Sequence, residues 1–288
     1  MSNQSSLKKT SADLWGDCPS DGPETFMIYG SPRSGKTFKY LQLIQAAHIT
    51  RNETRAFVIN TDKSLFRNLH EFPYLESNEI VKVKMCNSFD EIMSAVSTLI
   101  GSRFLTKDDW IILDLASFAW NGCPDYYCRT VLGKSADEIE KDYMLYQIAR
   151  DKDKGGNALL KYYATGINPM WSRFETAIRN SGCHVIMVCG EKKLDEDGIP
   201  SMGKKPDKVE LVSNFKQIGL IPDIQKNTPF MYHTIIYCSQ PYVKRFFVET
   251  AGDKGSREWI PRTETNRTGN EIDFGELYLS NIAGWGRS

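Results

Sequence analysis

The sequence of 288 residues lacks a long hydrophobic run: no apolar stretch approaches the roughly 18 residues that a membrane-spanning helix needs. The first ten residues, Met1 to Thr10, are polar and contain no signal-peptide core. These absences predict a soluble, cytoplasmic protein without a membrane partner, located in the host cytoplasm if the protein is viral.

A net charge is also missing, because 36 Lys and Arg residues balance 36 Asp and Glu residues. Bulk charge therefore does not indicate a nucleic-acid partner, although a local basic patch can still bind one. The seven cysteines lack metal-ligand spacing, since Cys123 and Cys128 are separated by four residues and no second pair follows. We expect reduced thiols and no structural zinc.

A phosphate-binding loop is the most specific pattern present. We expect an apolar strand at Thr25–Tyr29 and a helix from Lys36 to about Ile49, and this context is the one that the motif G-x-x-x-x-G-K-T requires. The motif is formed by Gly30, Ser31, Pro32, Arg33, Ser34, Gly35, Lys36 and Thr37. The sequence therefore predicts that these eight residues bind a nucleoside triphosphate.

Each fixed position of this loop has a chemical reason. Gly30 and Gly35 allow backbone N–H groups to turn inward around a phosphate without a Cβ in the way. Lys36 is expected to reach the β- and γ-phosphate oxygens, and Thr37 to offer its hydroxyl to Mg²⁺. The following helix directs its positive end at the same anion.

A second element of such sites is predicted at Asp109–Asp114, an apolar strand that ends in an acid. Asp114 fits the Walker B position, whose carboxylate holds Mg²⁺ through water. Apolar strands ending in Asp are common, so this assignment depends on its place about 80 residues after the P-loop. Thr37 and Asp114 are the expected metal ligands.

The remaining pattern predicts an α/β fold with a doubly wound, mainly parallel sheet. Further strands are expected at Ala56–Asn60, Ile80–Val83 and His184–Cys189, and Ser88 with Glu91 forms a capping box before a helix. Toward the C-terminus, a hairpin is expected from Thr234–Cys238 and Val243–Glu249, and residues 194–208 form an exposed charged loop.

The expected domain organisation has three parts. Residues 1–23 form a flexible tail, residues 24–250 the ATPase core, and residues 251–288 an extension that packs on the core. The core contains an aromatic-rich insertion at about residues 119–170. Its aromatic side chains either pack on the core as a helical insertion, which we favour, or form a base-stacking surface.

The order of elements separates classes of P-loop protein. A small-molecule kinase normally has an Arg-rich lid late in the chain, and AAA+ motors append a helical lid domain after the core. This sequence has no Arg cluster there and is strand-rich instead. These features favour the RecA-like branch.

The sequence resembles the phage-type RecA-like ATPases, known as AAA-domain or nucleotide-binding phage proteins, some of which work in single-strand annealing recombination. The resemblance covers most of the chain, but only the P-loop is specific. It lies in Gly30–Thr37, Ile59–Asp62, Ile111–Asp114 followed by Ser117, Val188–Lys192 and Ala283–Trp285.

The resemblance implies a catalytic set of Lys36, Asp62, Asp114 and Glu191, with ATP and Mg²⁺ bound. Asp62 would orient the attacking water, although relatives usually carry a Glu there and the shorter side chain reduces the reach. Glu191 would sense the γ-phosphate. Both acids can alternatively be solvated residues at strand ends. Lys192 and Lys193 are candidates for a cation supplied across a subunit interface, or form a solvated turn.

We therefore expect a Mg²⁺-dependent ATPase of phage DNA recombination or replication that works as a homo-oligomer on single-stranded DNA. Basic residues that could contact DNA are Lys192, Lys193, Lys204, Lys205, Lys208, Lys244 and Arg245. The alternative is a nucleotide-dependent switch or an assembly or packaging factor that does not bind DNA, which the zero net charge favours. A phosphotransferase is disfavoured by the missing lid.

Overall fold

The computed structural model describes residues 23–51, 54–62, 64–102, 104–149, 159, 162–194, 206–242, 245–253, 262–265 and 274–275. The expected tail lies outside these residues apart from Pro23. The closing Ala283–Trp285, residues 195–205 of the charged loop and Lys244 also lie outside them.

Eight strands of the described residues form one sheet in the order β10-β9-β8-β1-β5-β4-β2-β3. Neighbouring strands from β8 to β3 are parallel, whereas β8–β9 and β9–β10 are antiparallel. The expected α/β, mainly parallel sheet is therefore confirmed. Its strands are β1 (Thr25–Gly30), β2 (Ala56–Asn60), β3 (Val81–Met85), β4 (Trp110–Asp114), β5 (His184–Cys189), β8 (Thr234–Tyr242), β9 (Arg245–Asp253) and β10 (Thr263–Thr265).

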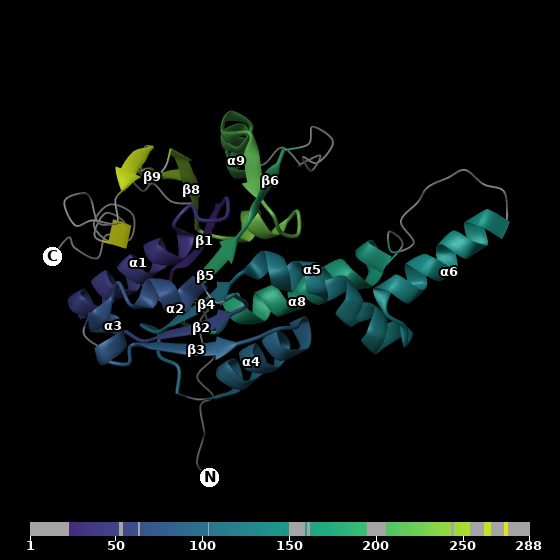
Figure 1. Cartoon of the computed structure of the whole chain (residues 1–288), viewed down its shortest axis with the longest axis horizontal. Helices are drawn as coiled ribbons and strands as arrows, with labels where there is room; N and C mark the ends of the chain where they lie inside the picture. Colours follow the sequence, from purple (N-terminus) through teal and green to yellow (C-terminus); the bar gives the residue numbers. More distant parts are fainter. Residues whose placement is uncertain are drawn as a thin grey trace, which may run out of the picture.

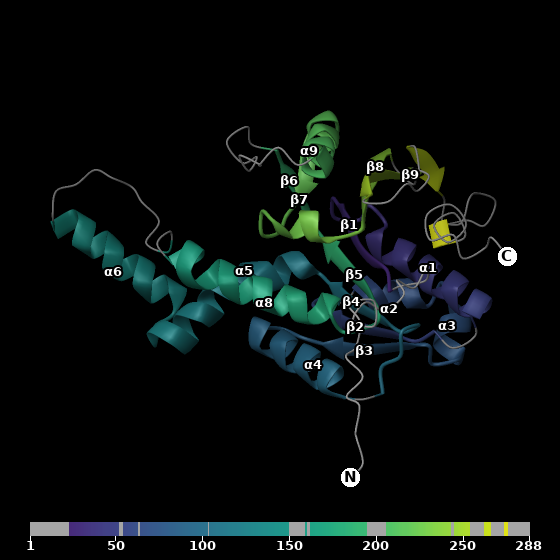
Figure 2. The same ribbon diagram turned by 180° about the vertical axis from the view of Figure 1, so that it is seen from behind.

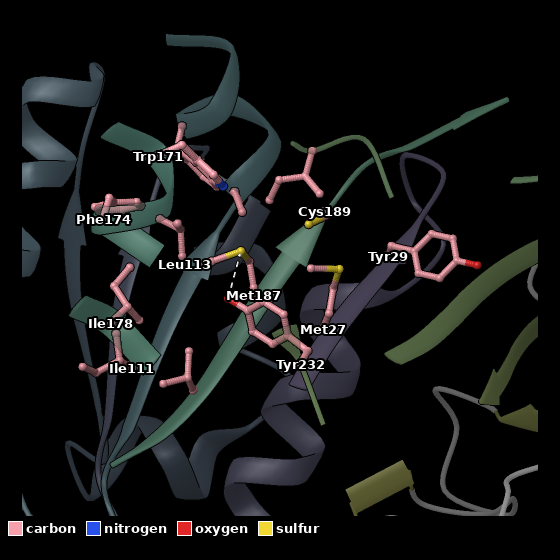
Figure 3. Close-up of a cluster of buried hydrophobic side chains, with 14 of the residues drawn as sticks. Met27, Tyr29, Ile111, Leu113, Trp171, Phe174, Ile178, Met187, Cys189 and Tyr232 are labelled. Atoms are coloured by element: carbon pink, nitrogen blue, oxygen red, sulfur yellow. Dashed lines mark hydrogen bonds between the residues drawn. The ribbon is translucent and has the colours of Figure 1, made fainter. Parts of the chain in front are cut away.

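Both faces of the sheet are covered, because successive side chains of a strand point to opposite faces. In β1, Met27 and Tyr29 enter one buried cluster, and Phe26 and Ile28 enter the other. Figure 3 shows the first cluster, in which residues of β1, β4 and β5 meet the aromatic side chain of Trp171. Burial on both sides explains why these strands are nearly continuous apolar runs.

Helices complete the two outer layers (Figures 1 and 2). Residues of α1 (Lys36–Arg51), α2 (Ser64–Leu69) and α3 (Pro73–Ser77) contribute to the cluster of Phe26. Residues of four other helices contribute to the cluster of Met27, and the sheet is doubly wound as expected. These helices are α4 (Phe89–Gly101), α5 (Ala116–Tyr127), α8 (Asn168–Arg179) and α9 (Pro206–Ile218).

The expected insertion is helical where it is described. After α5 the chain forms a π-helical segment at Cys128–Leu132, then α6 (Ala136–Ala149), and later a second π-helical segment at Tyr163–Ile167. Helix α6 extends away from the sheet (Figures 1 and 2). The core-packing interpretation is confirmed for five aromatic side chains, which pack against the cluster of Met27: Trp120, Tyr126, Tyr127, Tyr162 and Tyr163.

The expected antiparallel pair near the C-terminus is confirmed, since β8 pairs with β9. Both strands are longer than expected, and β8 also joins the main sheet by parallel pairing with β1. The charged loop expected at residues 194–208 ends earlier, since α9 begins at Pro206. A small second sheet of β6 (Glu191–Lys193) and β7 (Leu220–Pro222), followed by a 3-10 helix at Thr228–Met231, was also not expected.

The described residues include six cysteines and a short part of the C-terminal extension. Six cysteines of the described chain are free and buried. Phe274 is buried in the cluster that includes α1, and a Cβ on the adjacent Gly275 would lie 2.3 Å from the carbonyl oxygen of Gln42. Among the described residues, no helix combines the length and apolarity needed to cross a bilayer.

Candidate functional site

The candidate site lies where the carboxyl ends of four adjacent strands meet. The P-loop follows β1, Glu191 follows β5, Asp114 ends β4, and Asp62 follows β2. The register pairs Asn60 with Asp114, so the ends of β2 and β4 are level. Ligands of open α/β sheets bind at this edge of the sheet.

Close packing restricts the two glycines of the P-loop. A Cβ on Gly30 would lie 2.0 Å from the carbonyl oxygen of Cys238 in β8, so no larger residue fits there. Gly35 has a φ of +86°, which L side chains rarely adopt. The loop backbone is therefore packed against β8 at Gly30 and takes, at Gly35, a conformation that glycine adopts readily.

Lys36 and Ser34 are buried polar residues of the P-loop. The Lys36 ammonium is largely buried and donates hydrogen bonds to the carbonyl oxygens of Gly30 (2.8 Å) and Ser31 (2.7 Å). Burial lowers the pKa of Lys36, and nearby groups including Asp114 oppose this. The hydroxyl of Ser34 is buried without a hydrogen-bond partner among the described residues, so it remains available to a phosphate oxygen. By contrast, Pro32 and Arg33 are exposed at the tip of the loop.

Thr37 and Asp114 meet as the sequence predicts. The Thr37 hydroxyl donates to Oδ2 of Asp114 at 3.2 Å, although these residues are 77 positions apart. The buried hydroxyl of Tyr40, one helical turn after Thr37, donates to the same oxygen at 3.0 Å. Sequence analysis missed Tyr40, because an aromatic residue on the inner face of an amphipathic helix normally indicates only core packing.

Burial and a second acid change the protonation of Asp114. Desolvation, with a further contribution from the Asp62 carboxylate, raises the pKa of Asp114 from 3.8 to about 6. The hydrogen bond from Tyr40, the Lys36 charge and the Thr37 hydroxyl act in the opposite direction. A buried carboxylate with a raised pKa is stabilised by a cation that replaces its lost hydration.

Asp62 is fixed by its backbone surroundings. One of its carboxylate oxygens accepts a hydrogen bond from the Ser64 N–H at 2.7 Å, and its own N–H donates to the Asn60 side chain at 3.5 Å. Thr61 joins β2 to β4, since its N–H donates to the Asp114 carbonyl oxygen and its hydroxyl accepts from the Leu115 N–H. The second carboxylate oxygen of Asp62 has no hydrogen bond among the described residues.

Glu191 approaches the site from β6. Its carboxylate acts on the charge of Lys36, and its Oε2 is buried without a hydrogen-bond partner in the described part of the chain. Burial and the Glu191 carboxylate raise the pKa of Tyr237, a second residue that the sequence did not indicate. Next to Glu191, the Gly190 N–H donates to the Ser117 hydroxyl at 2.8 Å, which ties β5 to α5.

The basic residues are arranged differently from the acids. Lys192 forms an ion pair with Asp223 at 3.3 Å, and Arg245 forms one with Glu264 at 2.5 Å. Lys193 is exposed on β6. Lys204 and Lys205 lie outside the described residues, as does the side chain of Lys208.

The donor set fits MgATP better than a resident metal ion. The described residues contain no group of three or more His, Cys, Asp or Glu side chains that could hold a metal. Mg²⁺ commonly takes one or two protein ligands and completes its shell with phosphate oxygens and water. Thr37 and Asp114 provide such a pair beside a loop whose lysine and glycines suit phosphates.

Comparisons with known proteins add little to this geometry. No protein-family model matches the sequence, and no curated protein matches it. Among solved structures, the chain is similar to a KaiC-like protein from the hyperthermophilic archaeon Pyrococcus horikoshii OT3, with 12% identity and a TM-score of 0.40. The similarity covers 84% of this chain and 85% of that chain. The functional argument therefore depends on the site itself.

Proposed function

We propose that this protein is a Mg²⁺-dependent ATPase of the RecA-like branch of P-loop proteins. The observation that carries the proposal is the contact between Thr37 and Asp114 beside a P-loop lysine. These residues belong to separate motifs, and only the fold brings their oxygens within 3.2 Å. A chance match to the P-loop pattern would not be expected to produce this contact.

Each residue of the site has a role that follows from its position. Lys36 would exchange its two carbonyl acceptors for phosphate oxygens, and the Ser34 hydroxyl would gain a partner there. Thr37 and Asp114 would hold Mg²⁺, which neutralises charge on the β- and γ-phosphates when bound. The free oxygen of Asp62 would accept a hydrogen bond from the attacking water and orient it.

The RecA-like assignment is supported by the strand order. Strand β5 lies between the P-loop strand β1 and the Walker B strand β4, so Glu191 emerges between the two motifs. A buried carboxylate oxygen without a partner at this place suits a group that responds to the γ-phosphate. The phage and DNA-recombination parts of the proposal come from the sequence resemblance described above.

The test is ATP hydrolysis measured with and without Mg²⁺. Lys36→Ala should abolish hydrolysis without unfolding the protein, because the two hydrogen bonds that Lys36 donates in the absence of nucleotide stay within the P-loop. Lys82→Ala is a matched control, since Lys82 is an exposed lysine on the distant edge strand β3. Unchanged turnover in Lys36→Ala would contradict the P-loop assignment.

A second comparison locates the catalytic base. Asp62→Asn should preserve nucleotide affinity and reduce the chemical step, since the change removes a water-orienting group and no phosphate contact. Asp62→Glu should retain hydrolysis. If Asp62→Asn hydrolyses ATP at the normal rate, the base lies elsewhere, and Glu191 is the next residue to substitute.

The alternative function is a nucleotide-dependent switch, or an assembly or packaging factor, that does not bind DNA. It is favoured by the ion pairs of Lys192 and Arg245, which neutralise two of the cations that DNA contacts would use. Both functions require the same nucleotide site. DNA-stimulated hydrolysis distinguishes them, because only the recombination protein should respond to single-stranded DNA.

A further inference from the structure

A cavity of about 420 Å³ lies between the paired strands β6 and β7 and five helical segments: α5, the π-helical segment at Tyr163–Ile167, α8, α9 and the 3-10 helix at Thr228–Met231. Its size falls within the roughly 300–1,000 Å³ of small-molecule sites. Apolar and aromatic side chains form most of its wall, and several are large: Trp120 of α5, Tyr163, Phe215 of α9, Ile221 of β7, Ile224 and Phe230. This wall favours a flat apolar body, because aromatic side chains pack well against other rings.

The polar groups at the cavity are mainly cationic. Three lysines line it, and Lys192 is already paired with Asp223. Lys193 and Lys226 are exposed and form no ion pair with a described residue. None of the described residues that line this cavity is acidic. Two ammonium groups without an ion-pair partner among the described residues, beside an apolar wall, are complementary to a ligand that carries negative charge on an apolar body.

The cavity is connected to the nucleotide site through short paths. Strand β6 carries Glu191 at its first position, whereas the next two residues, Lys192 and Lys193, line the cavity. On the other side, the ring of Phe215 packs edge-to-face on Tyr29 of β1 at 6.0 Å between centroids. A ligand that moves β6 or Phe215 therefore acts on residues next to the P-loop.

Helix α5 forms a third connection. Trp120 lines the cavity, and Ser117, one turn earlier on the same helix, accepts the hydrogen bond from the Gly190 N–H. Gly190 immediately precedes Glu191, and its carbonyl oxygen accepts from the Asp223 N–H at 2.9 Å. The backbone that positions Glu191 is thus fixed by Ser117 of α5 and by Asp223, which directly follows β7, and both of these elements line the cavity.

We propose that this cavity is a regulatory site for a small amphipathic anion, with an aromatic or aliphatic body and a carboxylate, sulfonate or phosphate group. The body packs against Trp120 and Phe215, and the anionic group lies near Lys193 and Lys226. Occupancy changes the position of Glu191 and with it the rate of hydrolysis. This last effect rests on the proposed ATPase function, whereas binding does not.

Binding is tested with 1-anilinonaphthalene-8-sulfonate, an aromatic sulfonate whose fluorescence rises in apolar surroundings, and with its uncharged analogue N-phenyl-1-naphthylamine. The full chain should bind one molecule of either dye. Val212→Trp places an indole in the cavity from α9 and should abolish binding of both. Val131→Trp, at an exposed position outside this cavity, is the matched control and should bind both dyes normally.

The charge contribution is tested by the double variant Lys193→Ala/Lys226→Ala. The double variant should bind the sulfonate dye about threefold or more weakly, because two partly solvated ion pairs are lost. Its affinity for the uncharged dye should be unchanged. The control Lys82→Ala/Lys216→Ala removes two lysines that do not line the cavity. Equal weakening of the two dyes by the first variant would overturn the assignment of an anionic ligand.

The link to hydrolysis is measured separately. Saturating sulfonate dye should change the ATPase rate of the normal protein and leave the rate of Val212→Trp unchanged. Dye binding that Val212→Trp does not affect would overturn the site, and so would displacement of the dye by oligothymidylate at low salt, which would assign the cavity to DNA. A protein that binds dye and hydrolyses no ATP would contradict the proposed function while leaving the site in place.

Discussion

At the scale of single residues, the site is organised around the buried carboxylate of Asp114. Two hydroxyls, of Thr37 and Tyr40, donate to one of its oxygens. Its charge is nevertheless unfavourable without a bound cation, since burial and Asp62 raise its pKa to about 6. The protein thus maintains a group that is better suited to holding Mg²⁺ than to stabilising the empty fold.

This conflict predicts an opposite effect of Asp114→Asn on stability and on activity. The pKa rises from 3.8 to about 6 on folding, so the folded state binds more protons between these values. The stability that protonated Asp114 contributes is therefore fully present below pH 3.8 and is lost as the pH rises through 6. The loss lowers the free energy of unfolding by about 3 kcal/mol. Hydrolysis should be lost in the variant, whereas its Mg²⁺-free thermal midpoint at pH 8 should exceed that of the normal protein.

The measurement is thermal unfolding without nucleotide or Mg²⁺ from pH 4 to pH 8. The advantage of Asp114→Asn should shrink toward pH 4, where Asp114 becomes protonated. Asp109→Asn is the contrasting control, because buried Asp109 accepts hydrogen bonds from Arg55 at 2.9 and 2.7 Å and its loss should lower the midpoint at pH 8. A difference for Asp114→Asn that does not vary with pH would contradict the raised pKa.

Tyr40 provides a second prediction at this scale. Tyr40→Phe removes one of the two hydroxyl donors to Asp114, a loss of about 1 kcal/mol in a buried hydrogen bond. We expect a several-fold higher Mg²⁺ requirement for hydrolysis with little change in fold. Tyr232→Phe is the matched control: its hydroxyl is equally buried but contacts the sulfur of Met187 at 3.2 Å in the core (Figure 3). Equal effects of the two changes would exclude a specific role for Tyr40.

At the scale of elements, the sequence predicted a helix, strand or loop correctly where neighbouring residues alone determine that structure. The P-loop, β2, β4 and β5 were predictable, because buried parallel strands are short apolar runs and the glycines mark the loop. Helices α2 and α3 were missed, since six and five residues are too short to reveal a helical period. The pairing of β8 with β1 could not be predicted, because it joins residues more than 200 positions apart.

The residues of the candidate site divide in the same way, into those that a local motif predicts and those that matter through contacts distant in sequence. Lys36, Thr37 and Asp114 belong to motifs that can be read one at a time, and the fold brings them together as expected. Tyr40 and Tyr237 matter through their neighbours in space, and nothing in their own sequence context separates them from core aromatics. Prediction from one sequence therefore placed the motif residues of the proposed site and missed the buried tyrosines that interact with them.

The capping box of α4 gives a prediction at the element scale. The Ser88 hydroxyl accepts from the Glu91 N–H at 3.3 Å, and the Glu91 carboxylate accepts from the Asn87 N–H at 2.7 Å. Ser88→Ala should therefore lower the unfolding free energy by about 1 kcal/mol. Because α4 lies away from the P-loop, hydrolysis should be unchanged at a temperature where the protein is folded. Ser88→Asp should retain most of the stability, whereas equal losses in both variants would exclude a capping role.

At the scale of the whole molecule, the decisive property is that charge is balanced overall but not locally. Acids gather at the ends of β2 and β4 and at the start of β6, whereas the next segment of the chain carries both signs. Its lysines either form a local basic field or are cancelled by the acids of the same segment: Lys204, Lys205 and Lys208 against Asp195, Glu196, Asp197 and Asp207. The described residues on either side of residues 195–205 of this segment are Leu194, directly after β6, and Pro206, the first residue of α9. We expect DNA bound by this segment to lie near Glu191, at the start of β6.

The last prediction is that single-stranded DNA binds weakly to one subunit and usefully to an ATP-bound oligomer. Each phosphate contact contributes a salt slope of about −0.7 for single strands, so a few contacts per subunit are weak alone and strong when repeated. Binding should therefore fall steeply with salt and require ATP or a slow analogue. It should also weaken in the triple variant Lys204→Ala/Lys205→Ala/Lys208→Ala.

The control triple Lys82→Ala/Lys84→Ala/Lys107→Ala removes the same charge from exposed positions on β3 and before β4. Equal weakening by both triples would indicate a general charge effect, and no DNA affinity at low salt with saturating ATP would favour the switch or assembly factor.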